Sequence, residues 1–202
     1  MAKNRGFVPA RHLDGANCFH TERFLKATDQ NDRSLIYVGD PVYLLADGTI
    51  ARLHPAQVTA GLTGNLGVLG VAARVLVNED GRPRVHGLTQ VPAQHPNISL
   101  TADADYLDVY TDPGIVYNCG VDGSAGRSMI GQTVGIAATA RTTAAGVGGT
   151  ILDTAVVTAG SVFNPFKIIG MSDFELSGRA GNSDGNVQAI VNYHVYKAAQ
   201  SF

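Results

Sequence analysis

The segment Val42-Tyr43-Leu44-Leu45-Ala46-Asp47-Gly48-Thr49-Ile50-Ala51-Arg52-Leu53 carries the clearest local structural signal in the chain. Two short apolar runs, residues 42–45 and 50–53, flank an Asp-Gly dipeptide. Glycine adopts positive φ angles at little cost, so Asp-Gly between such runs is typical of a tight β-hairpin turn. The segment therefore predicts two antiparallel strands joined at Asp47-Gly48.

Further apolar runs and turn signals extend in both directions from this hairpin. Residues 66–77 are almost uniformly apolar, and Gly67, Gly70 and four valines favour a buried strand bent at its glycines over a helix. The turn signal at residues 111–114 predicts that 115–118 return alongside 106–110. Other strand candidates are residues 18–25, 35–38, 133–140, 166–171 and 187–196. A strand every roughly 8–12 residues predicts an all-β protein, a compact barrel or sandwich with long loops.

The composition agrees with an all-β fold. Among 202 residues, 24 glycines and 8 prolines argue against a helical bundle, because both residues weaken helix interiors. Hydrophobic residues form 45% of the chain, which is enough for a core. The formal net charge of −2 lacks the basic excess of a general nucleic-acid binder. Charged residues are only 16%, which indicates a surface that is partly covered in an assembly.

The cysteines and the apolar segments bear on the compartment. Cys18 and Cys119 could pair only once and form no disulfide framework, so a reducing cytoplasm is the simplest site of synthesis. The amino-terminal residues lack the apolar core of a signal peptide, and no apolar stretch is long enough for a membrane span. We therefore expect a protein with no membrane partner.

The first 16 residues follow neither the strand nor the helix period. They surround the lone apolar pair Phe7-Val8 with glycine, proline and basic residues. Such a segment has no obvious face to bury in its own fold, so it is either a disordered tail or an arm that orders on a partner. We expect an extended arm over residues 1–16 and a single β-rich domain over residues 17–202.

A search for catalytic and metal-binding motifs yields no candidate site. The six histidines, at positions 12, 20, 54, 86, 95 and 194, form no close pair and are expected to be isolated surface or interface residues. Asp103, Asp105 and Asp108 lack the Gly and Glu of a calcium loop and are expected to form an acidic turn. The glycine-rich run 146–149 lacks the lysine of a phosphate-binding loop. We therefore predict no enzyme activity, no cofactor and no metal.

Several short blocks, in order along the chain, resemble the capsid decoration (cement) proteins of tailed bacteriophages. The blocks are Asn4-Arg5-Gly6-Phe7-Val8-Pro9-Ala10-Arg11, Gly39-Asp40-Pro41-Val42-Tyr43-Leu44, Asp47-Gly48-Thr49-Ile50, Leu69-Gly70-Val71-Ala72, Gly149-Thr150-Ile151-Leu152-Asp153-Thr154, Ile168-Ile169-Gly170 and Val191-Asn192-Tyr193-His194-Val195-Tyr196. The resemblance implies a β-rich structural protein on the outer surface of the virion capsid. Its partner would be the major capsid protein, whose neighbouring subunits it would hold together.

The resemblance also suggests a role for the amino-terminal arm. Phe7 would be an apolar anchor, Arg5 and Arg11 would contact carboxylates of the coat protein, and Pro9 would be a joint. Deleting residues 2–14 is then expected to leave a folded domain with weakened capsid binding. The habits of the family favour a homo-oligomer, a trimer in particular.

Two other functions stay open at this point. The chain could be another phage component, such as a head-completion or tail protein, which would be present in fewer copies. It could also be a carbohydrate- or receptor-binding module, although it lacks Trp. The tyrosines that could stack on a sugar are Tyr37, Tyr43, Tyr106, Tyr110 and Tyr117.

Overall fold

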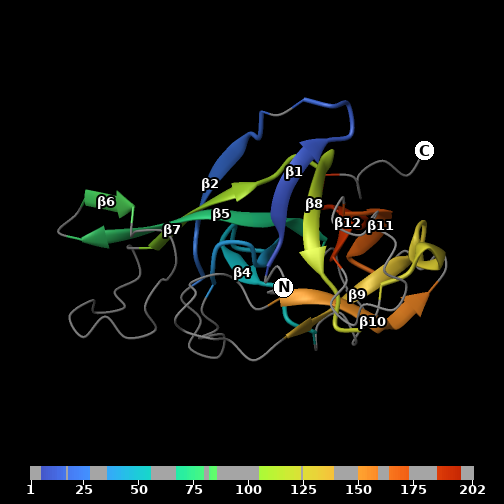
Figure 1. Ribbon diagram of the computed structural model, residues 1–202. Helices are drawn as coiled ribbons and strands as arrows, with labels where there is room; N and C mark the ends of the chain where they lie inside the picture. The colour runs from blue at the N-terminus through green and yellow to red at the C-terminus, as the bar shows by residue number, and fades with distance from the viewer. Residues whose placement is uncertain are drawn as a thin grey trace.

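Two antiparallel β-sheets make up the fold (Figure 1). The computed structural model of the protein describes residues 6–16, 18–27, 36–55, 67–79, 82–85, 105–123, 125–138, 150–158, 164–172 and 186–196. The strands are β1 (Val8–His12), β2 (Thr21–Leu25), β3 (Pro41–Leu44), β4 (Ile50–Arg52), β5 (Val68–Glu79), β6 (Arg82–Val85), β7 (Asp105–Tyr110), β8 (Ile115–Gly120), β9 (Thr133–Ala138), β10 (Thr150–Thr158), β11 (Phe166–Met171) and β12 (Asn186–Val191). One turn of 3-10 helix, η1 (Arg127–Met129), precedes β9. The all-β prediction is confirmed, and the sheets are compatible with a sandwich rather than a closed barrel.

The first sheet has the strand order β1-β8-β12-β11-β9-β10. Within it, β8 and β12 are an antiparallel pair in which Tyr117 lies opposite Ala189 and Val116 opposite Ile190. The strand β1 forms one edge, beside β8 in Figure 1, and β10 forms the other. The sheet therefore joins the beginning of the described chain to its last strands.

The second sheet has the order β2-β7-β5-β3-β4, with β6 paired to β5. The far ends of β5 and β7 extend away from the rest of the molecule together with β6 (Figure 1). Lys26, just after β2, forms a parallel bridge with Ile50 of β4, and the Ala27 N–H donates to the Ile50 carbonyl at 2.9 Å. The two end strands of this curled sheet thus meet at a bridge, without the ladder that would close a barrel.

The second sheet has buried apolar side chains on both of its faces. Successive strand residues point to opposite faces, and both faces here carry apolar side chains. Tyr43 and Val68 belong to a core shared with the first sheet, whereas Val42 and Leu69 belong to a core on the opposite face. This arrangement explains why residues 68–72 are all apolar or glycine. The second core consists of Ile36, Val42, Ile50, Leu69, Ala72, Leu107 and Val109.

The predicted hairpin is confirmed as the antiparallel pair β3 and β4. Leu44 lies opposite Ile50, and Gly48 in the turn has a φ of 82°. The Asp47 carboxylate closes the turn, because it accepts hydrogen bonds from the Thr49 N–H at 2.9 Å and the Thr49 hydroxyl at 2.7 Å. The same bonds hold the pKa of Asp47 below its usual value.

Glycine at position 70 allows β5 to approach β7 closely. A Cβ atom at Gly70 would overlap the backbone carbonyl oxygen of Tyr110. The register between β3 and β5 also shifts here, since Val42 lies opposite Gly70 but Tyr43 lies opposite Val68. The predicted bend at this glycine is therefore present as a β-bulge.

Four sequence expectations about strands differ from the structure. Of the strand candidate 35–38, the described residues 36–38 form no strand. The strand β8 does not return beside β7, because the turn at residues 111–114 carries the chain from the second sheet to the first. The last strand ends at Val191 instead of continuing to residue 196, and His194 instead bridges Val68. The edge strand β10 was not predicted as a strand at all.

The prediction of a separate amino-terminal arm is wrong for the described residues 6–16. The strand β1 pairs with β8, with Val8 opposite Asn118 and His12 opposite Ile115. Phe7 is only 2% exposed and belongs to the core shared by the two sheets. Phe7 is the large apolar side chain that this segment buries, and together with the β1–β8 ladder it incorporates the segment into the fold.

Candidate functional site

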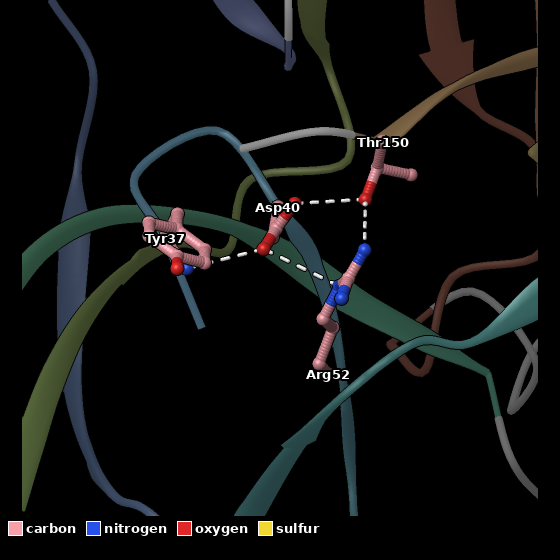
Figure 2. A network of polar contacts seen from close by, with 4 residues as sticks. All are labelled: Tyr37, Asp40, Arg52 and Thr150. Carbon is pink, nitrogen blue, oxygen red and sulfur yellow. Dashed lines mark hydrogen bonds and ion pairs between the residues drawn. The ribbon is translucent and has the colours of Figure 1, made fainter. Parts of the chain in front are cut away.

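A buried polar network joins the two sheets (Figure 2). Asp40 and Arg52 form an ion pair, with 3.3 Å between Arg52 Nε and Asp40 Oδ2. Arg52 Nη2 donates to the Thr150 hydroxyl at 3.1 Å, and that hydroxyl donates to Asp40 Oδ1 at 2.7 Å. Asp40 and Thr150 are fully buried and Arg52 is 3% exposed. The network is the most buried group of charges in the described part of the chain.

Local structure places each member of this network. Asp40 directly precedes β3, in a turn where its N–H donates to the Tyr37 carbonyl at 3.0 Å. Its carboxylate in turn accepts the Tyr37 N–H at 3.1 Å. Arg52 ends β4 in the second sheet, and Thr150 begins β10 in the first. One carboxylate therefore connects a turn, an end strand of the second sheet and an edge strand of the first.

The chemistry of the network suits a structural role, in which it stabilises the contact between the two sheets. A buried charge is tolerated only when it is paired and hydrogen-bonded, and the Asp40 carboxylate has both a guanidinium and two hydrogen-bond donors. In the sequence, Asp40 stood out only as a member of one resemblance block, and Arg52 was not predicted to have a role. The sequence signal that could have indicated this buried ion pair was the presence of an arginine inside the short apolar run 50–53.

The structure separates the four predicted arm residues instead of presenting them on one surface. Phe7 stacks on Phe166 with 4.4 Å between ring centroids, so the proposed apolar anchor is part of the interior. Pro9 is partly buried in β1. Arg11 is exposed and donates to Gln188 Oε1 at 3.5 Å, while Arg5 lies outside the described residues. Of the four, Arg11 is the described side chain that a partner could reach.

The edge formed by β1 is poorly suited to adding another strand. Pro9 has no N–H to donate, and the register with β8 shifts between Pro9 and Arg11. Proline and bulges are common devices that prevent sheet edges from pairing with other chains. Val8 and Leu13 are exposed at either end of this segment, at 45% and 52%.

Two of the histidines do not lie on the surface as expected. His12 is 8% exposed, stacks on Phe19 and lies 3.5 Å from Asp112. His194 is 1% exposed, and its Nδ1 accepts a hydrogen bond from the Tyr196 N–H at 3.1 Å. His20 and His54 are exposed, whereas His86 and His95 lie outside the described residues.

The acidic turn predicted around Asp108 differs from the structure, in which Asp108 lies in a strand and its side chain forms an ion pair. Asp108 lies in β7 and accepts from Arg23 Nε at 2.9 Å. This hydrogen bond raises the pKa of Arg23. Asp103 and the glycine-rich run 146–149 lie outside the described residues. Within the described ranges, no three His, Cys, Asp or Glu side chains are grouped as metal ligands, and no helix is long and apolar enough to cross a membrane.

The two cysteines are both free thiols. Cys18 is exposed, whereas Cys119 is buried in the core, where its thiol lies 3.8 Å from the Val187 carbonyl. Burial raises the pKa of Cys119, so this thiol stays protonated and behaves as a small apolar side chain.

The tyrosines considered for sugar stacking are largely interior. Tyr37, Tyr43 and Tyr117 are buried, and Tyr106 and Tyr110 are partly buried within β7. The hydroxyl of Tyr117 is buried without a hydrogen-bond partner among the described residues, and burial raises its pKa. These positions serve packing between the strands.

Comparisons with known proteins add no relative. No protein-family model, curated protein or solved structure matches the chain.

Proposed function

We propose that this chain is a structural virion protein that binds the outer surface of a tailed-phage capsid, without catalysis. It would stabilise contacts between subunits of the major capsid protein, after synthesis in the host cytoplasm. The seven ordered sequence blocks that resemble decoration proteins support this proposal. The low proportion of charged residues, 16%, supports a protein whose surface is partly covered in an assembly.

The observation that carries the proposal is the ion pair Asp40–Arg52 with Thr150 between the sheets. A protein that holds neighbouring shell subunits together must resist forces that would slide its own sheets apart. An apolar core resists separation but is not directional, whereas hydrogen bonds and ion pairs fix one relative position. The buried network therefore fits a mechanical role.

The proposed partner is the major capsid protein, and the proposed assembly is a homo-oligomer, a trimer by the habits of decoration proteins. Many equal contacts on a shell add up, so each individual contact need not be strong. Size-exclusion chromatography with light scattering measures the oligomeric state of the free protein directly.

Adding the protein back to shells tests the proposed function. Purified chain is mixed with expanded shells that lack it, and the mixture is sedimented. We expect the protein to sediment with the shells at saturable occupancy and to raise the temperature at which they come apart. Sedimentation with unexpanded and expanded shells measures whether binding needs the mature lattice. Failure to bind shells, or binding with no gain in shell stability, would contradict the proposal.

A further inference from the structure

On the outer face of the first sheet, the four strands β1, β8, β12 and β11 carry charge of one sign only. Strand register places Arg11 of β1 opposite Val116 of β8, Val116 opposite Ile190 of β12, and Ile190 opposite Lys167 of β11. The residues that alternate with these, such as Tyr117 and Ala189, belong to the core. The row from Arg11 to Lys167 therefore faces away from the second sheet. Two cationic residues lie at its ends, with their backbones three strand spacings or about 14 Å apart.

A second row on the same face is uncharged and rich in amides. Val8 lies opposite Asn118, and Asn118 lies opposite Gln188. Arg11 reaches from β1 to Gln188 of β12 at 3.5 Å, so its side chain must cross the intervening strand β8. Val116 of β8, which points to the same side, is fully buried. The guanidinium thus lies over the sheet, against a neutral partner.

Acidic residues are absent from the four strands of this face. The strands β1, β8, β12 and β11 contain no Asp or Glu, and no ion pair of Arg11 or Lys167 occurs among the described residues. An outward carboxylate first occurs at the far edge of the sheet, where Asp153 of β10 lies opposite Gly135. The face is thus cationic in a chain whose net charge is −2.

We propose that this face, defined by Arg11, Gln188, Ile190 and Lys167, docks onto a carboxylate-bearing protein surface. Within the proposed function, on which this inference rests, that surface belongs to the coat subunit. Because the Arg11 side chain reaches across β8 to Gln188, its guanidinium lies nearer to Lys167 than the backbone spacing of the two residues. The two cations therefore form one positively charged patch that suits a surface bearing carboxylates. The amides between them donate hydrogen bonds, and Ile190 supplies apolar contact. Complementary charge of this kind fixes orientation and speeds association.

Charge reversal with a matched control tests the docking face. The test variant is Arg11→Glu/Lys167→Glu, and the control is Arg74→Glu/Arg127→Glu, which changes two exposed cations elsewhere by the same charge. Circular dichroism and thermal melting confirm that both variants are folded. Each protein is then assayed on expanded shells, on immobilised poly-glutamate and on immobilised double-stranded DNA, over a range of salt concentrations.

We expect the face variant to bind shells and poly-glutamate about tenfold more weakly than the wild type, and the control to bind within about twofold. Equal losses in both variants would overturn the inference, because the effect would then follow net charge alone. Stronger retention on DNA than on poly-glutamate would overturn it too, in favour of a phosphate ligand. If the wild-type protein does not bind shells, but binds poly-glutamate and loses that binding only in the face variant, the proposed function is contradicted and the acidic-surface inference stands. If the wild-type protein and the face variant bind shells equally well, the acidic-surface inference is contradicted and the proposed function stands.

Discussion

Replacing Arg52 with methionine removes the positive charge from the inter-sheet network while retaining a long apolar side chain. Asp40 then keeps its donors, the Tyr37 N–H and the Thr150 hydroxyl, but loses its counter-charge in a fully buried position. Breaking a buried ion pair by removing one partner typically costs about 3–5 kcal/mol. Domains of ordinary stability have about 5–15 kcal/mol in total, so the expected loss is a large fraction.

The double variant Asp40→Asn/Arg52→Met distinguishes a buried-charge penalty from a packing defect. Asparagine removes the remaining charge and keeps an oxygen that can accept the Thr150 hydroxyl. Replacing both members of a buried pair with uncharged residues is often close to neutral. We therefore expect the double variant to recover most of the stability lost in Arg52→Met.

Urea denaturation followed by circular dichroism measures these differences. For a chain of this length, a loss of 3–5 kcal/mol corresponds to a fall in melting temperature of roughly 6–20 °C. Arg74→Met, at an exposed cation of the same sheet, is the control and should change stability by no more than about 0.5 kcal/mol. A loss below about 1 kcal/mol in Arg52→Met, or an unrescued double variant, would refute the reasoning.

Four further predictions follow from local features. Phe7→Ala should cost about 3–5 kcal/mol of unfolding free energy in urea melts, because it empties a core site; a free arm would show no change. Tyr117→Phe should be neutral or raise stability by about 1 kcal/mol, since it removes a buried hydroxyl without a described partner; a clear loss would reveal a partner. Gly70→Ala should cost about 2 kcal/mol or more, because its Cβ would overlap a carbonyl of β7, whereas Gly126→Ala, with room for a Cβ, should be mild. An NMR titration should give Asp47 a pKa below the ordinary aspartate value. The stability from its hydrogen bonds is then present at pH values above the ordinary aspartate pKa and is lost as the pH falls through the lowered pKa of the folded protein. An ordinary pKa for Asp47 would contradict the turn geometry.

Local sequence signals predicted the parts of the fold that depend on neighbours in the chain. The Asp47-Gly48 hairpin needs only turn chemistry and two adjacent strands, and both are visible in a dozen residues. The bend at Gly70 was likewise visible as a glycine within an apolar strand. These features are local because the hydrogen bonds that form them join residues close in sequence.

Features that depend on distant partners could not be predicted in this way. The turn at residues 111–114 looks like a hairpin turn, but whether a strand returns or changes sheet depends on which surfaces become buried. Phe7 was assigned to an arm because its surroundings are polar, yet its partner Phe166 is far along the chain. The pairing of Arg52 with Asp40 and Thr150 likewise requires the two sheets to be assembled first.

The pairing of β1 with β8 changes what a deletion of the amino-terminal residues would report. Deletion of residues 2–14 would remove β1 and the buried ring of Phe7. Loss of capsid binding in that variant would therefore report unfolding as readily as a lost contact. Charge reversal at Arg11 and Lys167 leaves the ladder and the core intact and is the cleaner test of binding.

A cryo-EM reconstruction of phage particles that carry this protein tests the central claim most directly. The account predicts β-sandwich density in many copies over the outer surface of the shell, with the outer face of the first sheet against the coat subunits. Density confined to a single ring at the portal or tail, or the absence of the protein from the outer shell surface, would contradict it.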